Sequence, residues 1–294
     1  MRLQSTIRDR LCERLGLHIG HQVDIRAEIP AGGGSINDSY RLETDAGRFF
    51  VKMNAADRFP SLFEAEADGL RRLHEAEALQ VPDVIDHGEI DGHGYLLLEW
   101  IESGLKEHGF WEELGRGLAR LHRHSQAQFG LDRDNYIGSL KQANAPAADW
   151  PSFFIRQRLE PQLKLARDHQ RLGDGAAFRF ERLFMQIDRL FPTEPPALLH
   201  GDLWSGNILC DARSQPVLLD PAVHYGHREM DLAMTRLFGG FEDPFYAAYH
   251  AEWPVAEGWE ERVDLCNLYP LMVHVNLFGG AYTAQVESIL KRIA

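Results

Sequence analysis

The chain has 294 residues, a length that indicates two compact lobes or one large domain. Hydrophobic residues make up 44% and charged residues 26%, which is ordinary for a folded globular protein and excludes intrinsic disorder. The formal net charge is −13, so the chain lacks the broad positive field that duplex nucleic acid or an anionic membrane surface requires. We therefore expect neither nucleic acid nor membrane as a partner.

The three cysteines, Cys12, Cys210 and Cys266, are far apart, and no Cys-x-x-Cys pair indicates zinc. We interpret them as free thiols in a reducing compartment. The N-terminal stretch mixes charged with apolar residues and is unlike a signal peptide. The most apolar late stretch, 269–282, is shorter than the roughly 20 residues of a bilayer span. We expect a cytoplasmic protein.

The first hundred residues predict a small antiparallel sheet. A helix is predicted over 3–17. Apolar and charged residues then alternate over 23–29, which is typical of a strand, and a glycine run at 32–34 ends it. Two further strands are predicted over 39–44 and 48–52, joined by a tight turn.

Ser61 begins a second predicted helix, with Glu64 placed to complete a capping box. One more strand is predicted over 95–101, and beyond it the pattern is mainly helical. The expected helices cover 110–122, 150–166, 177–190 and the region from Glu229 to the C-terminus, with a short β region at 197–220 between them.

These elements predict an α+β, bilobal fold. We expect a small antiparallel, β-rich lobe over 1–102 and a larger, mainly helical lobe over 103–294, with a cleft between them.

The strongest functional signal is the segment His200-Gly201-Asp202-Leu203-Trp204-Ser205-Gly206-Asn207, followed by a predicted hairpin and then by Asp220. Oxygen ligands on a loop and at a strand end can converge on one hard cation, and Mg²⁺ prefers such ligands. A carboxylate on the same loop can accept a proton from a substrate hydroxyl. The spacing matches the catalytic loop and metal-binding Asp of kinases, although each residue alone would read as an ordinary turn residue.

Glu66 falls on the apolar face of the second helix, between Phe63 and Leu70. A carboxylate in that position is costly unless a cation meets it, and Lys52 at the end of a strand is the nearest candidate. A strand lysine held by a helix glutamate is how kinases bind nucleotide phosphates. The alternatives are a solvated edge lysine and a glutamate at a loose lobe edge.

Two more segments fit nucleotide binding. Backbone amides at Gly32, Gly33 and Gly34 would allow the close approach of a phosphate, although a glycine hairpin turn explains them equally well. Residues Glu99 to Ile101 would form the hinge whose backbone meets adenine, or simply the end of a strand.

With these motifs in place, the chain resembles the fructosamine kinase (ketosamine kinase) family, within the wider group that includes aminoglycoside and choline phosphotransferases. The resemblance covers nearly the whole chain. Its most diagnostic segments are the 200–207 loop, Asp220-Pro221-Ala222 and Tyr225-Gly226-His227-Arg228-Glu229, supported by Phe50-Val51-Lys52, Asn135 to Gly138, Gln142, Asn144, Arg158-Leu159, Phe238-Gly239-Gly240 and Phe278-Gly279-Gly280. Trp204 and the 225–229 segment distinguish this family from the antibiotic kinases. Some relatives carry a redox-sensitive cysteine in the glycine loop, where this chain has Ser35, so we expect no thiol control there.

The resemblance implies a role for each matching residue. Asp202 is expected to be the catalytic base, Asn207 and Asp220 the Mg²⁺ ligands, and Lys52, held by Glu66, the residue that binds the α- and β-phosphates of ATP. Gly32, Gly33 and Gly34 would cover the phosphates, and Glu99 and Ile101 would contact adenine through their backbones.

On the acceptor side, Trp204 is expected to stack against the sugar-amine substrate. Tyr225 and His227 either line the acceptor or belong to the scaffold. His200 is expected to pack beneath the loop, and Asp231 to hydrogen-bond its backbone.

The implied function is an ATP- and Mg²⁺-dependent kinase that phosphorylates the sugar 3-hydroxyl of ketosamines. The product tends to decompose and release the free amine, so the role is deglycation of small amines or proteins. Alternatives are a related kinase for an aminoglycoside, choline or homoserine, and a catalytically inactive nucleotide-binding module. We expect a monomer.

Overall fold

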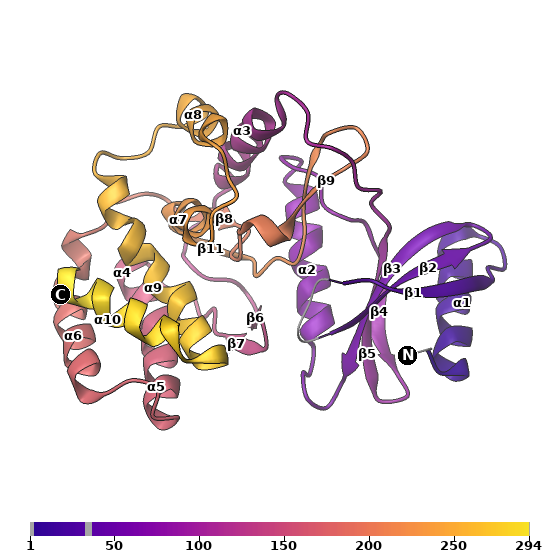
Figure 1. Ribbon diagram of the computed structural model, residues 1–294, viewed down its shortest axis with the longest axis horizontal. Coiled ribbons are helices and arrows are strands. Elements are labelled where there is room, and N and C mark those ends of the chain that lie inside the picture. The colour runs from indigo at the N-terminus through magenta and orange to yellow at the C-terminus, as the bar shows by residue number, and fades with distance from the viewer. Residues whose placement is uncertain (1–2, 33–36, 294) are drawn as a thin grey trace. The chain divides into compact units, whose positions relative to one another are not determined.

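The structure is a computed structural model that describes residues 3–32 and 37–293. The chain divides into two compact units, whose elements are labelled in Figure 1. Unit 1 comprises Met1–Glu107 and Leu209–Asp220, and unit 2 comprises His108–Ile208 and Pro221–Ala294. The sequence places the whole of 103–294 in the second lobe, whereas the structure assigns residues 103–107 and 209–220 to the first unit.

Unit 1 contains an antiparallel sheet in the order β1-β2-β3-β5-β4. The strands and the two accompanying helices are α1 (Ser5–Ile19), β1 (Ile25–Pro30), β2 (Asp38–Thr44), β3 (Gly47–Ala55), α2 (Leu62–Glu75), β4 (Val84–Ile90) and β5 (His93–Glu99). The predicted sheet and both helices are confirmed, but β4 is not among the predicted strands. Its residues are mostly half-buried, so its sequence lacks a clear apolar alternation.

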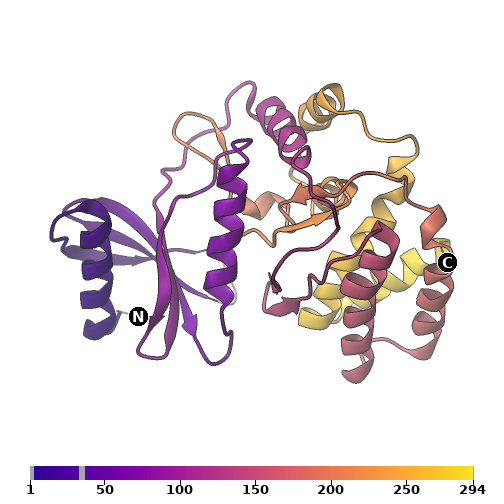
Figure 2. The ribbon, with the colours of Figure 1, turned by 180° about the vertical axis from the view of Figure 1, so that it is seen from behind.

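Alternation along β3 directs side chains to two differently covered faces of the sheet. Phe49, Val51 and Met53 share a core with α1. Lys52 points to the opposite face, where its side chain reaches α2. Figures 1 and 2 show α1 and α2 on opposite sides of the sheet. The period of a strand thus buries one lysine on the face of the sheet from which it reaches α2.

The predicted capping box at the start of α2 is wrong. Ser61 has a φ of 60°, in the left-handed region, and its side chain makes no capping hydrogen bond. A capping serine needs extended backbone so that its hydroxyl can turn back to the first turn of the helix.

A hairpin from late in the sequence joins unit 1. It consists of β9 (Ile208–Cys210) and β10 (Pro216–Leu218). The backbone amide of Gly104 donates to the Cys210 carbonyl oxygen at 2.8 Å, and that of Leu218 donates to the Gln80 carbonyl oxygen at 2.9 Å. A Cβ atom at Gly104 would lie 2.3 Å from the Asp211 carbonyl oxygen, so only glycine allows this approach. These contacts explain why the boundary lies beyond residue 102.

Unit 2 is mainly helical. Its elements are α3 (Phe110–His122), β6 (Asn135–Ile137), β7 (Leu140–Gln142), α4 (Trp150–Phe153), α5 (Glu160–Asp168), α6 (Asp174–Phe184), β8 (Ala197–Leu199), β11 (His224–Gly226), α7 (Glu229–Leu237), α8 (Asp243–Glu252), α9 (Trp259–Phe278) and α10 (Ala281–Ile293). The predicted helix over 110–122 is confirmed. The one predicted over 150–166 is α4, a π-helix at Phe154–Leu159 and α5 in succession, and the one over 177–190 begins and ends earlier, as α6.

The π-helix carries a fully buried arginine. Arg158 donates to the Asn144 side-chain oxygen at 2.7 Å and to the Ala143 carbonyl oxygen, and its guanidinium lies over the Phe153 and Tyr269 rings. Burial lowers its pKa to about 10. This group and the amides around it fix the β6–β7 hairpin against α9.

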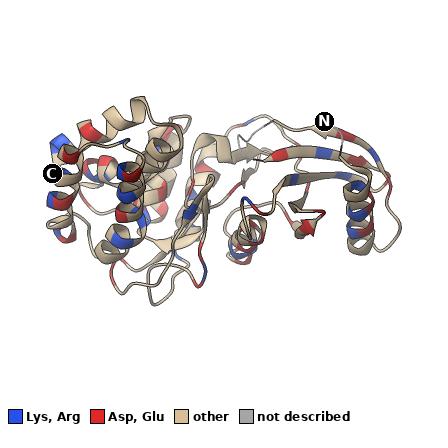
Figure 3. Cartoon of the chain, turned by 90° about the horizontal axis from the view of Figure 1, so that it is seen from below, with Lys and Arg blue, Asp and Glu red and all other residues tan. Residues whose placement is uncertain are grey.

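No helix among residues 3–32 and 37–293 is long and apolar enough to cross a membrane. Acidic and basic residues are interspersed along the helices of both units (Figure 3).

The close contact between α3 and α8 generates a stability prediction. A Cβ atom at Gly115 would lie 2.3 Å from the Phe245 carbonyl oxygen, so Gly115→Ala must push the two helices apart. We expect it to lower the free energy of unfolding by about 1–3 kcal/mol, measured by urea denaturation. Gly175→Ala in α6 is the control, because a Cβ there meets only a side-chain nitrogen at 3.5 Å. Equal stability of the two variants would contradict this packing.

Candidate active site

Lys52 is the centre of an ion cluster in unit 1. Its Nζ lies 2.7 Å from Glu66 Oε1 on α2 and 2.5 Å from Asp220 Oδ1, at the end of the segment that follows β10. The predicted pairing of Lys52 with Glu66 is therefore present, and Asp220 completes a triad. The three residues come from a strand, a helix and a distant hairpin, all within unit 1.

The triad keeps a buried lysine charged. Lys52 is only 5% exposed, and burial alone would lower its pKa. Attraction to Glu66 and Asp220 outweighs that effect, so the pKa of Lys52 lies above its ordinary value. Burial also raises the pKa of Glu66, against the opposing attraction of Lys52. The result is a fixed ammonium whose position is set by two carboxylates.

Asp220 stands at a sharp change of backbone direction. Its φ is 54°, in the left-handed region that residues with a Cβ rarely adopt. Its side chain keeps 41% of its surface exposed, whereas that of Lys52 keeps 7%. The Asp220 carboxylate therefore binds Lys52 with one oxygen, while much of the Asp220 side chain remains accessible to solvent.

The second part of the site is the 200–207 loop, which lies in unit 2 and follows β8. Gly201 has a φ of 82°, and a Cβ atom there would lie 2.1 Å from the Ala222 carbonyl oxygen. The Ala222 amide donates to the His200 carbonyl oxygen at 2.9 Å. Glycine is thus required for the loop to pack against the segment after Asp220.

Asp231 on α7 holds this loop from beneath, as predicted. Its carboxylate accepts hydrogen bonds from the backbone amides of His200 at 2.7 Å and Gly201 at 2.9 Å. His122 on α3 lies 3.2 Å from the same carboxylate and contacts the Tyr249 hydroxyl with its other nitrogen. Burial would raise the pKa of Asp231, but the interactions with His122 and the loop outweigh it and hold the pKa below its ordinary value.

Within the loop, Asn207 orients Asp202. The side-chain nitrogen of Asn207 donates to the Asp202 carboxylate at 3.1 Å and to the Asp202 carbonyl oxygen at 2.9 Å. The two residues, five positions apart, thus form one structural unit. His200 is fully buried, and its Nδ1 accepts a hydrogen bond from the Asp202 amide at 3.3 Å.

The donor set of these residues fits a magnesium ion. The amide nitrogen of Asn207 is engaged by Asp202, while no described residue is hydrogen-bonded to its amide oxygen. Asp220 uses Oδ1 for Lys52, and its other oxygen is likewise not bonded to any part of the chain that the structure describes. An amide oxygen and a carboxylate oxygen are the hard ligands that Mg²⁺ prefers.

The residues predicted to contact nucleotide differ in whether the structure describes them and in what their backbone contacts. Gly33 and Gly34 lie outside the described residues, and Gly32 follows β1, where a Cβ atom added to it would meet no heavy atom within 4 Å. Glu99 ends β5, and its backbone amide donates to the Asp83 carbonyl oxygen at 3.0 Å. That amide is therefore engaged, and Ile101 follows as a half-buried residue outside the strand.

The three residues predicted on the acceptor side differ in how far they are exposed to solvent. Trp204 is 38% exposed on the 200–207 loop. Tyr225 is half-buried in β11, where its backbone exchanges hydrogen bonds with Gly130. His227 is fully buried against the rings of Trp150 and Phe191, and burial lowers its pKa. These contacts match the scaffold alternative for His227.

The rest of the 225–229 segment is structural within unit 2. The Arg228 guanidinium donates two hydrogen bonds to the Glu194 carboxylate, at 2.7 and 2.8 Å. The Arg262 guanidinium likewise donates two to the Glu229 carboxylate, at 2.7 and 2.6 Å. The sequence analysis names Arg228 and Glu229 only as part of a family motif and does not predict these partners, which lie 34 and 33 residues away along the chain.

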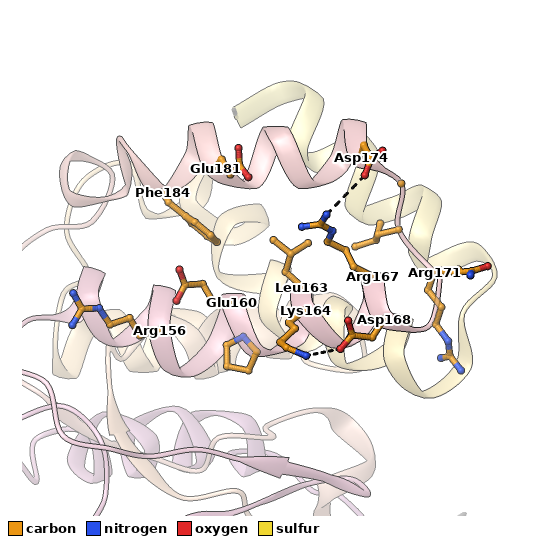
Figure 4. Close-up of a pocket in the computed structure, with 14 residues that line it drawn as sticks. Arg156, Glu160, Leu163, Lys164, Arg167, Asp168, Arg171, Asp174, Glu181 and Phe184 are labelled. Carbon is orange, nitrogen blue, oxygen red and sulfur yellow. Dashed lines mark hydrogen bonds and ion pairs between the residues drawn. The ribbon is translucent and has the colours of Figure 1, made fainter.

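A large cavity in unit 2 lies apart from these residues. It has a volume of about 1,210 Å³ and is lined by residues between Arg156 and Phe184, mainly from α5 and α6 (Figure 4). Lys164 is paired with Asp168 at 2.6 Å, and Arg167 approaches Asp174 at 4.0 Å. Acidic and basic groups are thus paired within its wall, and none of the described residues that line the cavity belongs to the 200–207 loop.

A sheet with a carboxylate-clamped lysine and a helical unit with an Asp202–Asn207 loop define a phosphotransferase of the protein-kinase-like class. A sequence model described as fructosamine kinase matches residues 9–294. The chain therefore belongs to the fructosamine kinase family.

Related sequences agree with this assignment. The chain is 43% identical to a chloroplastic protein-ribulosamine 3-kinase from Arabidopsis thaliana over 88% of this chain and 80% of that protein. It is 41% identical to a protein named as a probable ketoamine kinase from Enterococcus faecium over 90% of this chain and 94% of the relative.

Solved structures give the same result. A crystal structure named as a fructosamine-3-kinase from Thermobifida fusca has 36% identity and a TM-score of 0.85, with 96% of this chain and 98% of that chain covered. A thermostable mutant of an aminoglycoside phosphotransferase has only 15% identity and a TM-score of 0.63, with coverage of 96% and 98%. The second likeness shows the shared kinase-like fold alone.

The role of Asp231 generates a pH-dependent prediction. Because its pKa is lowered by folding, its contribution to stability is present above the ordinary value of 3.8 and is lost as the pH falls through the folded-state pKa. We expect Asp231→Asn to lower the free energy of unfolding by about 2–4 kcal/mol near neutral pH, since a buried amide is left poorly paired. The difference from the unsubstituted protein should shrink below about pH 4. A difference in urea denaturation that is independent of pH would contradict this role.

Proposed function

We propose that the protein transfers the γ-phosphoryl group of ATP to the 3-hydroxyl of the sugar in a ketosamine. The observation that carries the proposal is that one chain contains both a carboxylate-clamped Lys52 and an Asp202–Asn207 loop anchored by Asp231. Phosphoryl transfer requires mainly alignment and charge neutralisation, and these are the groups that supply both.

Each group has a defined task in this proposal. Asp202 accepts the proton of the sugar hydroxyl and orients its oxygen toward the phosphorus atom. Asn207 fixes the Asp202 carboxylate through its side-chain nitrogen. Lys52, held by Glu66, binds the α- and β-phosphates, with the Gly32–Gly34 segment over the phosphates and the backbone of Glu99 and Ile101 beside adenine.

Asn207 and Asp220 would hold Mg²⁺ through the side-chain oxygens to which no residue in the described part of the chain is hydrogen-bonded. The ion supplies neutralisation of phosphate charge. Lys52 alone carries one positive charge against two carboxylates, so the triad by itself cannot offset a polyphosphate.

The substrate class rests on the relatives. Their names specify ketoamines and protein-bound ribulosamines, and they share about two residues in five with this chain over nearly its whole length. Phosphorylation at the 3-hydroxyl makes a ketosamine prone to decompose to the free amine, so we assign the protein a role in deglycation. The aminoglycoside and choline kinase alternatives are not favoured, because the corresponding structures have only 15% and 13% identity.

The acceptor range tests the proposal. The purified protein with ATP and Mg²⁺ is expected to release ADP in the presence of a ribulosamine or a fructosamine, because the catalytic loop is built to activate a sugar hydroxyl. Choline and kanamycin are the comparison acceptors. Turnover with choline or kanamycin alone, measured by a coupled ADP assay, would overturn the proposal.

The control for that assay is Asp202→Asn, which removes the base without touching Lys52. Turnover should fall by about 10²–10⁴-fold, while ATP affinity in calorimetry stays within a few fold. Asp174→Asn, at a fully exposed position, serves as the matched substitution and should retain turnover. A large loss of ATP affinity in Asp202→Asn would show that Asp202 binds nucleotide instead.

A further inference from the structure

Five polar side chains form one buried network in unit 2. Each residue is at most 6% exposed, and they come from β6, β7, the segment after β7, the π-helix and α9: Asn135, Gln142, Asn144, Arg158 and Tyr269. We call these five residues the amide network. Four of them belong to the segments that carry the family resemblance, yet none of the five has a task in the phosphoryl transfer proposed above.

The first branch of the network takes its direction from Arg158, because an arginine side chain can only donate hydrogen bonds. Arg158 donates to the Asn144 side-chain oxygen at 2.7 Å, and the Asn144 nitrogen donates to the Asn135 side-chain oxygen at 2.9 Å. That Asn135 oxygen also accepts from the Gln142 nitrogen at 2.8 Å. Asn135 therefore turns its own nitrogen to the Val223 carbonyl oxygen, to which it donates at 2.8 Å.

The second branch starts at Tyr269 on α9. Its hydroxyl donates to the Gln142 side-chain oxygen at 2.7 Å, so Gln142 presents its nitrogen in the other direction. That nitrogen donates to the Ala222 carbonyl oxygen at 3.1 Å, and His224 Nδ1 lies 3.2 Å from the same oxygen. The two branches thus end on consecutive backbone carbonyls, those of Ala222 and Val223.

Ala222 is the residue against which the 200–207 loop packs. Its amide donates to the His200 carbonyl oxygen at 2.9 Å, and a Cβ atom at Gly201 would lie 2.1 Å from its carbonyl oxygen. The oxygen that Gln142 binds is therefore the same atom that limits the approach of Gly201. A shift of Ala222 must move the loop that carries the proposed base.

The electrostatics of the network agree with this connection to the loop. Burial raises the pKa of Tyr269 to about 12, and the negative charge of Asp202 adds to the increase while Arg158 opposes it. Asp202 is thus close enough to Tyr269 for its charge to act on the phenol. Burial lowers the pKa of Arg158 to about 10, so the guanidinium remains charged near neutral pH and keeps directing the amides.

We propose that the amide network positions Asp202. It fixes the Ala222 carbonyl, and through Ala222 the 200–207 loop, in the arrangement that aligns the base with the acceptor hydroxyl. This proposal rests on the proposed function, since it assigns positioning residues for the base of that reaction. Gln142 and Tyr269 act through the loop, and a misplacement of about 1 Å in a reacting group can lower a rate about 100-fold.

The test compares two buried glutamines. Gln142→Met removes the donor to Ala222 and keeps a side chain of similar length. With saturating ATP and the ketosamine of ribose and methylamine, kcat should fall about tenfold, because the base is less well aligned. The KM for ATP should stay the same, since no member of the network belongs to the Lys52 cluster. Gln162→Met is the matched control: Gln162 is 4% exposed on α5 and accepts a hydrogen bond at 2.7 Å from Asn276 of α9, but lies outside the network.

Tyr269→Phe is the second variant, because it removes one hydroxyl and keeps the ring beside the Arg158 guanidinium. It should lower kcat by about threefold. Hydrogen exchange measured by mass spectrometry adds a readout that needs no turnover. Because the Ala222 amide is bonded to the loop, the peptide that contains it should exchange about tenfold faster in Gln142→Met than in the unsubstituted protein or in Gln162→Met.

The outcomes separate the two proposals. If the unsubstituted protein does not phosphorylate the ketosamine, the proposed function fails, and the exchange of the Ala222 peptide alone decides whether the network holds the loop. If the unsubstituted protein is active and Gln142→Met retains its kcat, this inference alone is overturned. An equal fall of kcat in Gln142→Met and Gln162→Met would show a general loosening of unit 2, and would also overturn it.

Discussion

A buried ammonium must be neutralised, and much of unit 1 is arranged to satisfy that requirement. Lys52 is 5% exposed, so its charge is tolerated only because Glu66 and Asp220 meet it directly. The alternation of β3 points the lysine to the face that α2 covers, and the hairpin from late in the sequence brings Asp220 to the same point. Loss of either carboxylate would leave Lys52 with one ion-pair partner in place of two, and its position would be less closely defined. The fold therefore sets the position of the lysine with little freedom, which is what binding a phosphate chain in one orientation requires.

Unit 2 applies the same principle with the opposite charge. Asp231 is buried beneath the 200–207 loop, and backbone amides together with His122 stabilise its carboxylate. The electrostatic requirement of one buried group thus determines the shape of the loop that carries Asp202 and Asn207. In both units a buried charge and its partners hold segments that carry proposed site residues.

The sequence predicted the features that leave a local signal. Strand alternation placed the sheet of unit 1, and a glutamate on an apolar helix face predicted its pairing with Lys52. The contact between Lys52 and Asp220 spans 168 residues and depends on the hairpin docking, for which no local pattern exists. The pairing of His122 with Asp231 spans 109 residues and was missed for the same reason. Ser61 failed as a helix cap because its left-handed backbone is not specified by residue type.

The most direct test of the account concerns Asp220, which is assigned both to the lysine clamp and to the metal. ATP affinity is measured by calorimetry with and without Mg²⁺, in the unsubstituted protein and in Asp220→Ala. The account predicts that Mg²⁺ strengthens ATP binding in the unsubstituted protein and that this enhancement is lost in the variant. An enhancement of equal size in both proteins would contradict the assignment of Asp220 as a metal ligand, and with it the proposed arrangement of the site.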